Sequence, residues 1–64
     1  MYLIRIKENR KFAIALEHPD AIWANVEEGS YVLKKNATQF RSRTDAEKEL
    51  NRQDEEIVEV SNGK

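Results

Sequence analysis

The stretch TQFRSRTDAEKELNRQDEEIVEV, residues 38–60, predicts the end of one strand, a short helix and a closing strand. Thr44 and Glu47 are three residues apart and fit a capping box, in which each side chain bonds the other residue's main-chain N–H. Negative charge at Asp45 and Glu47 also suits the positive end of a helix dipole. Because good helix formers follow without glycine or proline, we predict a helix over about residues 45–53.

The predicted helix has a narrow apolar stripe. Ala46 and Leu50 lie four residues apart and therefore on one face. A helix this short is marginal alone, so it must pack against something else. We expect Leu50 to be its main contact with a sheet, with Phe40 packing beneath it.

The segment EIVEV, residues 56–60, is rich in β-branched side chains and predicts a terminal strand. Val58 and Val60 share one face of that strand, and we expect this face to lie against the helix. The last residues, 61–64, are polar and predict a frayed tail.

Alternating apolar residues at the start of the chain predict a strand over residues 2–7 and a second over residues 11–17. A short polar turn between them indicates a hairpin. Pro19 then ends the pattern. The apolar run at residues 21–26 is either a third strand or a loop that buries Trp23 over a sheet edge.

A turn is predicted at residues 27–30, where Gly29 can take a positive φ. Residues 31–35 and 38–41 then predict two further strands before the helix.

These segments together predict an α+β fold. We expect an antiparallel meander of four to five strands with one short helix packed on one face, in the order β-β-(β)-β-β-α-β. The 64 residues suit a single domain over residues 1–60. A chain of this size buries only about 60% of its unfolded surface, so its core is expected to be small.

Composition limits the classes of function. The chain has no cysteine, which excludes disulfides, thiolate metal sites and a cysteine nucleophile. No run approaches the length of about 18 apolar residues that a membrane span needs. We expect no secretory signal and a cytoplasmic location.

The net charge of −1 is unevenly spread. Eight Lys/Arg and five Asp/Glu in residues 1–43 give +3, whereas three and seven in residues 44–64 give −4. The two halves either complement each other within the molecule or present an acidic face to a basic partner.

The sequence FRSRTDAEKEL at residues 40–50, followed by IVEV at residues 57–60, resembles the C-terminal end of many small bacterial and phage proteins. In those proteins a helix with the pattern F-x-S/T-x-x-x-A-E-x-x-L follows a hairpin and leads to a last strand. The resemblance covers about a third of the chain. It implies an α+β fold and a phage or mobile-element setting, and it carries no functional residues across.

Candidate catalytic groups are few. His18 is the single histidine, and Glu17 and Asp20 beside it could be drawn as a metal-ligand trio. Residues this close before a proline rarely converge on one ion, and no second histidine or cysteine completes the set. We interpret His18 as a turn residue, and we predict no catalytic, metal or cofactor site and therefore no enzyme.

Three hypotheses of function follow. The first is a non-enzymatic module that binds another protein, as a phage or mobile-element accessory that modulates a host protein. Its candidate contact residues are Trp23, Tyr31, Asp45 and Glu49. The competing interpretation of Trp23 is that it completes a small core.

The second hypothesis is a sheet face that binds single-stranded nucleic acid, with aromatic rings between basic side chains. Its candidate residues are Arg5, Lys7, Lys34 and Arg41. The third is a structural protein that self-associates, as a homodimer, by pairing strand edges. Membrane binding is not expected, because the only predicted helix is acidic.

Overall fold

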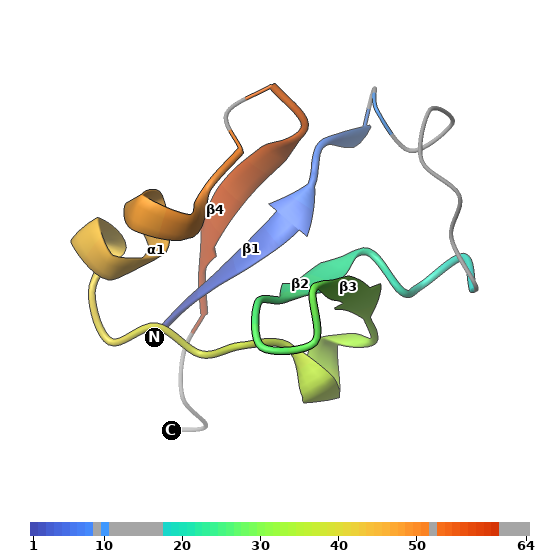
Figure 1. The fold of residues 1–64 in the computed structure, drawn as a ribbon, viewed down its shortest axis with the longest axis horizontal. Coiled ribbons are helices and arrows are strands. Elements are labelled where there is room, and N and C mark those ends of the chain that lie inside the picture. The colour runs from blue at the N-terminus through green and yellow to red at the C-terminus, as the bar shows by residue number, and fades with distance from the viewer. Residues whose placement is uncertain (9, 11–17, 52, 61–64) are drawn as a thin grey trace.

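The computed structural model describes residues 1–8, 10, 18–51 and 53–60. Its four strands form one antiparallel sheet in the spatial order β3-β2-β1-β4, and one α-helix lies against a face of that sheet (Figure 1). The elements are β1 (Tyr2–Ile6), β2 (Trp23–Asn25), β3 (Ser30–Val32), the 3-10 helix η2 (Lys34–Asn36), α1 (Arg43–Glu49) and β4 (Glu55–Glu59). The α+β class, the antiparallel sheet and the single helix are therefore confirmed for the described residues.

The strand order differs from the predicted meander, because β1 is a central strand. It pairs with β2 on one side and with β4 on the other, so the first and last strands are neighbours. Leu3, Ile4 and Ile6 are all buried, although they alternate between the two faces of β1. A strand whose two faces are both apolar is better covered in the middle of a sheet than at its edge.

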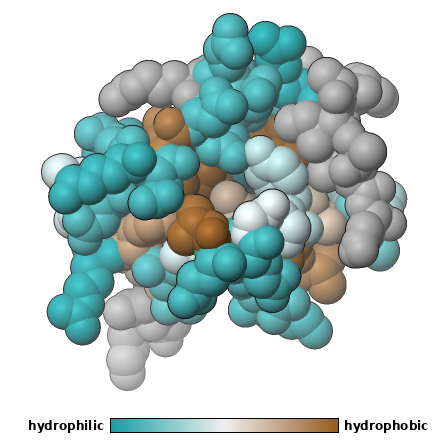
Figure 2. All heavy atoms as spheres, viewed as in Figure 1, coloured by the Kyte–Doolittle hydropathy of each residue, from teal (hydrophilic) through white to brown (hydrophobic). Residues whose placement is uncertain are grey.

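The core lies between α1 and the sheet. Ile4, Ala24 and Ala46 form its buried centre, and Ile4 and Ala46 have no exposed surface. Larger, partly buried side chains pack around this centre, namely Tyr2, Tyr31, Phe40, Leu50 and Ile57. Hydrophilic side chains surround the few apolar atoms visible from this side (Figure 2). The small Ala46 lets the helix lie close to the strands, as its sequence position predicts.

The helix begins two residues earlier than predicted. Ser42 is its N-cap, in an extended conformation, and its Oγ accepts a hydrogen bond from the Asp45 N–H at 3.1 Å. The predicted cap at Thr44 is therefore wrong, because Thr44 is already inside the helix. Both residues are good caps, and Ser42, whose own backbone is extended, takes the role.

The helix also ends before residue 53. Leu50 is already extended, with φ −80° and ψ 131°, and it packs against the core. Asn51 then organises a turn: its carbonyl oxygen accepts from the N–H groups of Asp54 and Glu55 at 3.1 and 2.8 Å. Its side-chain oxygen accepts from the Gln53 N–H at 3.1 Å. A local turn of this kind competes with continued helix.

The expected orientation of β4 is wrong. Ile57 pairs with Ile4 and packs on the core beneath α1, whereas Val58 pairs with Leu3 on the opposite face. Side chains alternate along a strand, so an error of one residue in the prediction moves every side chain to the other face of the sheet.

Two predicted strands are shorter than expected. β3 ends at Val32, and the residues that follow form η2. Of residues 38–41, only Phe40 makes a bridge, to Tyr2. The turn before β3 is confirmed, with Gly29 at φ +70°. The predicted strand over 11–17 and the tail at 61–64 lie outside the described residues.

Candidate functional site

The main-chain pairing of β1 with β4 fixes which groups of β4 point outward. The Val60 N–H donates to the Met1 carbonyl at 2.9 Å, and the Lys7 N–H donates to the Asp54 carbonyl at 2.7 Å. In an antiparallel ladder, hydrogen-bonded pairs alternate with pairs that are not bonded. The even-numbered residues of β4 therefore aim their polar groups at β1, and the odd-numbered residues aim theirs away from it.

Ile57 and Glu59 consequently present their N–H and C=O groups at the outer edge of the sheet. Within the part of the chain that the structure describes, β4 is an edge strand and no residue pairs with this side. The N–H of Glu55 differs, because it donates to the Asn51 carbonyl at 2.8 Å. The free edge is thus centred on residues 57–59.

Exposed carboxylates are found on β4 and on the helix that packs over it. The side chain of Glu59 is exposed, as are Asp45 and Glu49 on α1, which packs over β1 and β4. Glu56, on the other face of β4, accepts hydrogen bonds from the Arg5 guanidinium, at 3.1 Å from Nε and more closely from Nη2. The edge therefore combines unpaired main-chain groups with negative charge.

A second feature, the Trp23 patch, lies on the face opposite α1 and consists of Arg5, Trp23, Val32 and Lys34. Arg5 pairs with Trp23, and Trp23 pairs with Val32, so the three side chains form one row across β1, β2 and β3. The Arg5 Cζ lies 5.5 Å and the Lys34 Nζ 5.4 Å from the centre of the indole ring. Both cations are within the range of a cation–π interaction.

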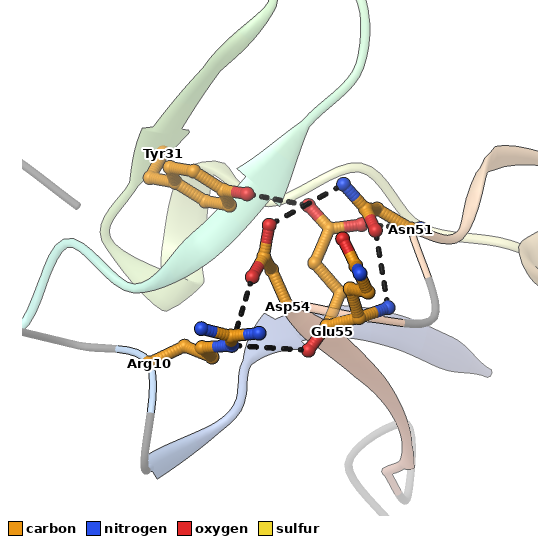
Figure 3. Close-up of polar contacts among 6 residues, drawn as sticks. Arg10, Tyr31, Asn51, Asp54 and Glu55 are labelled. Carbon is orange, nitrogen blue, oxygen red and sulfur yellow. Dashed lines mark hydrogen bonds and ion pairs between the residues drawn. The ribbon is translucent and has the colours of Figure 1, made fainter. Parts of the chain in front are cut away.

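Glu55 anchors a polar cluster between β3 and the turn that follows α1 (Figure 3). The residue is buried, with only 9% of its surface exposed. One carboxylate oxygen accepts from the Tyr31 hydroxyl at 2.6 Å, and the other accepts from the Asn51 N–H at 2.9 Å. Asp54 beside it forms an ion pair with Arg10 at 3.2 Å. Because both oxygens of Glu55 are occupied, the cluster ties elements together rather than offering a reactive group.

The environment of Tyr31 keeps its hydroxyl protonated. Burial raises the pKa of the Tyr31 phenol above its usual value, and the hydrogen bond to Glu55 raises it further. The negative charges of Glu55 and Asp54 act in the same direction. Tyr31 is therefore a fixed hydrogen-bond donor at neutral pH.

The four residues predicted to contact a protein partner do not share one surface. Asp45 and Glu49 lie exposed on α1, whereas Trp23 lies on the opposite face of the sheet. Tyr31 is on the helix side, packed on the core and bonded to Glu55.

The residues predicted to bind nucleic acid are separated in part. Arg5 and Lys34 come together at Trp23. Lys7 follows β1 by one residue and is half-buried. Arg41 instead lines an open hollow of about 410 Å³ with Met1, Gln39 and Phe40.

His18 lies in a turn, where its Nδ1 accepts from the Asp20 N–H at 3.2 Å. Glu17, which the sequence places beside His18, is outside the described residues. No described helix has the length and apolar character that crossing a membrane requires.

The sequence predicted an exposed strand edge but did not identify β4 as that edge, and it missed the role of Glu55. The alternation of EEIVE was visible, but the direction of its main-chain groups depends on which strand lies beside it. The signal for Glu55 was weaker still, because three consecutive acidic residues predict an exposed turn.

The chain was compared with protein-family models, with curated proteins and with solved structures, and none of them matches it.

Proposed function

We propose that this protein is a binding module that takes up an extended, basic segment of another protein along the outer edge of β4. The observation that carries the proposal is the pair of outward-facing residues Ile57 and Glu59, whose main-chain groups have no partner among the described residues. Edge strands recognise extended peptides in this way, by adding one more strand to the sheet.

The geometry supplies both affinity and register. A strand added beside β4 would lie at the usual spacing of about 4.8 Å and bond the N–H and C=O groups of Ile57 and Glu59. Its side chains would alternate between the α1 side, where Glu59 is exposed, and the other side, where Val58 lies.

The charge of the edge selects the partner. Glu59 is an exposed carboxylate on the strand itself, and Asp45 and Glu49 add negative charge from α1. Lysine or arginine at alternate positions of the incoming segment would complement this surface and increase the rate of encounter. An acidic segment would be repelled.

The test uses two blocked hexapeptides, one with alternating lysine and threonine and one with alternating glutamate and threonine. Each is titrated into the isotopically labelled protein while amide chemical shifts and amide hydrogen exchange are recorded. We expect the lysine peptide to bind at least about tenfold more tightly, because like charges in an interface are strongly unfavourable. The amides of Ile57 and Glu59 should exchange more slowly when it is bound.

Two substitutions at one position separate main-chain from side-chain recognition. Glu59→Pro removes an outward N–H while leaving the ladder to β1 intact, since that N–H does not face β1. We expect it to weaken binding about threefold to tenfold more than loss of the Glu59 charge alone does, the effect of one lost hydrogen bond. The matched variant Glu59→Gln keeps the N–H and should lose only the part of the affinity that high salt also removes.

Two outcomes would overturn the proposal. In the first, the lysine peptide binds but leaves the amides of Ile57 and Glu59 unchanged. In the second, Glu59→Pro and Glu59→Gln weaken binding equally, which would mean that charge alone holds the peptide.

A further inference from the structure

We propose a second binding site on this molecule: the Trp23 patch binds single-stranded nucleic acid, with a base against the indole ring and a phosphate between the two cations. This site lies on the sheet face opposite α1 and uses none of the groups at the outer edge of β4. It therefore stands independently of the proposed protein-binding function.

The patch has the composition that such a ligand requires. Single strands are bound by aromatic rings on which bases stack, together with cations that meet the phosphates. Trp23 is partly exposed, and the charged ends of Arg5 and Lys34 lie 5.5 and 5.4 Å from its ring centre. Val32 completes the row with an apolar surface beside the ring.

The two cations have different roles. The Arg5 guanidinium is held by Glu56 through two of its nitrogen atoms, which fixes its position beside the ring. Lys34 is exposed and begins η2, and no carboxylate pairs with it among the described residues. Its flexible chain can leave the ring when a base stacks there, and its ammonium group can then bind the adjoining phosphate.

The local charge favours an anionic ligand even though the whole chain is slightly acidic. Lys35 follows Lys34 on η2 and is also exposed. Glu56 is the carboxylate that contacts the patch, and it is already bonded to Arg5. Lys34 and Lys35 thus add positive charge beside β2, which η2 contacts, and they lie away from the exposed carboxylate of Glu59 on β4.

The experiment exploits the fact that Trp23 is the single tryptophan of the chain. Oligothymidylate of ten nucleotides is titrated into the protein at low salt, and tryptophan fluorescence is followed. Stacking of a base on Trp23 should quench the emission, and the affinity should fall with increasing salt. An abasic oligomer of the same length should bind at least about fivefold more weakly, because stacking contributes about 1–3 kcal/mol per base.

Matched variants test the geometry. Lys34→Gln should reduce the slope of log affinity against log salt by about 0.7, the contribution of one phosphate contact to a single strand. Lys48→Gln removes the same charge from α1, on the other face, and should leave the quenching and its affinity unchanged. Trp23→Phe keeps a weaker stacking surface, so binding followed by fluorescence anisotropy of a labelled oligomer should weaken without being abolished.

The proposal fails if oligothymidylate does not quench Trp23 at low salt. It also fails if the abasic oligomer or a polyglutamate peptide binds as tightly as oligothymidylate, since the patch would then be a general anion site. Equal effects of Lys34→Gln and Lys48→Gln would likewise exclude it, because binding would then depend on net charge alone.

Discussion

The start of α1 depends on one hydroxyl group. Ser42 Oγ accepts from the Asp45 N–H at 3.1 Å, and no other side chain among the described residues caps this helix. We expect Ser42→Ala to lower the free energy of unfolding by about 1 kcal/mol, measured by urea denaturation. Thr44→Ala is the matched control, because Thr44 lies inside the helix, and it should change stability by much less. A larger loss from Thr44→Ala would restore the capping box that the sequence predicts.

The hydroxyl of Tyr31 has a comparable role in the cluster around Glu55. Tyr31→Phe removes the donor to the carboxylate of a buried residue, and we expect a loss of about 1–3 kcal/mol in the free energy of unfolding at pH 7. Tyr2→Phe is the control, because the described residues offer its hydroxyl no hydrogen bond.

Tyr31 also makes the stability of the protein depend on pH in the alkaline range. Its pKa is raised by folding, so its contribution to stability is complete below the unfolded value of about 10 and is lost as the pH rises through the folded value. Above about pH 10 the wild type should therefore lose stability more steeply than Tyr31→Phe. Parallel curves for the two proteins, from denaturation at each pH, would show that Tyr31 ionises alike in both states.

At the scale of the elements, local sequence signals predicted which elements form better than where each one begins and ends. Alternation identified β1, glycine identified the turn before β3, and Ala46 with Leu50 identified the packed side of α1. The end of α1 was not predictable from helix propensity, because Asn51 bonds its own neighbours instead of extending the helix. The face of β4 also escaped prediction, since β-branched residues occupy both of its sides and only the pairing with β1 decides between them.

The contact of α1 with the sheet rests on a small side chain. Ala46 has no exposed surface and packs with Ile4 and Ala24, so a larger residue would push the helix away from the strands. We expect Ala46→Leu to lower the free energy of unfolding by about 1–3 kcal/mol, measured by chemical denaturation. Lys48→Leu introduces the same residue at an exposed position of α1 and should have a small effect. Equal stability of the two variants would mean that the helix does not lie close to the sheet.

At the scale of the whole molecule, the order of the strands in the sheet determines where the candidate sites lie. No short stretch of the sequence specifies that order. Strands β1 and β4 pair although they are the first and last of the chain, which turns β4 into an edge and brings Glu56 to Arg5. The basic first part of the sequence and its acidic last part are therefore adjacent in the sheet. The sequence predicted a basic first part and an acidic last part of the chain. It did not predict that the Arg5 guanidinium would contact both Glu56 and Trp23.

This arrangement also predicts how copies of the protein behave toward each other. If two β4 strands paired antiparallel with Ile57 opposite Ile57, Glu59 of each copy would lie opposite Glu55 of the other, whose outward N–H is already bonded to Asn51. Like charges directly opposite each other destabilise strand pairing, and charged residues protect natural edges from it. We therefore expect the wild type to sediment as a monomer, and Glu59→Val to form dimers, because it replaces a repelling charge with a β-branched side chain.

The control for this experiment is Glu49→Val, which removes an equal charge from the exposed surface of α1. Sedimentation velocity at several concentrations should show association for Glu59→Val alone, with slower hydrogen exchange at the amides of Ile57 and Glu59. Equal association of both variants would assign the effect to net charge. A wild-type dimer that protects the same two amides would show instead that β4 binds a second copy of the chain, and the edge would then be closed to a basic partner.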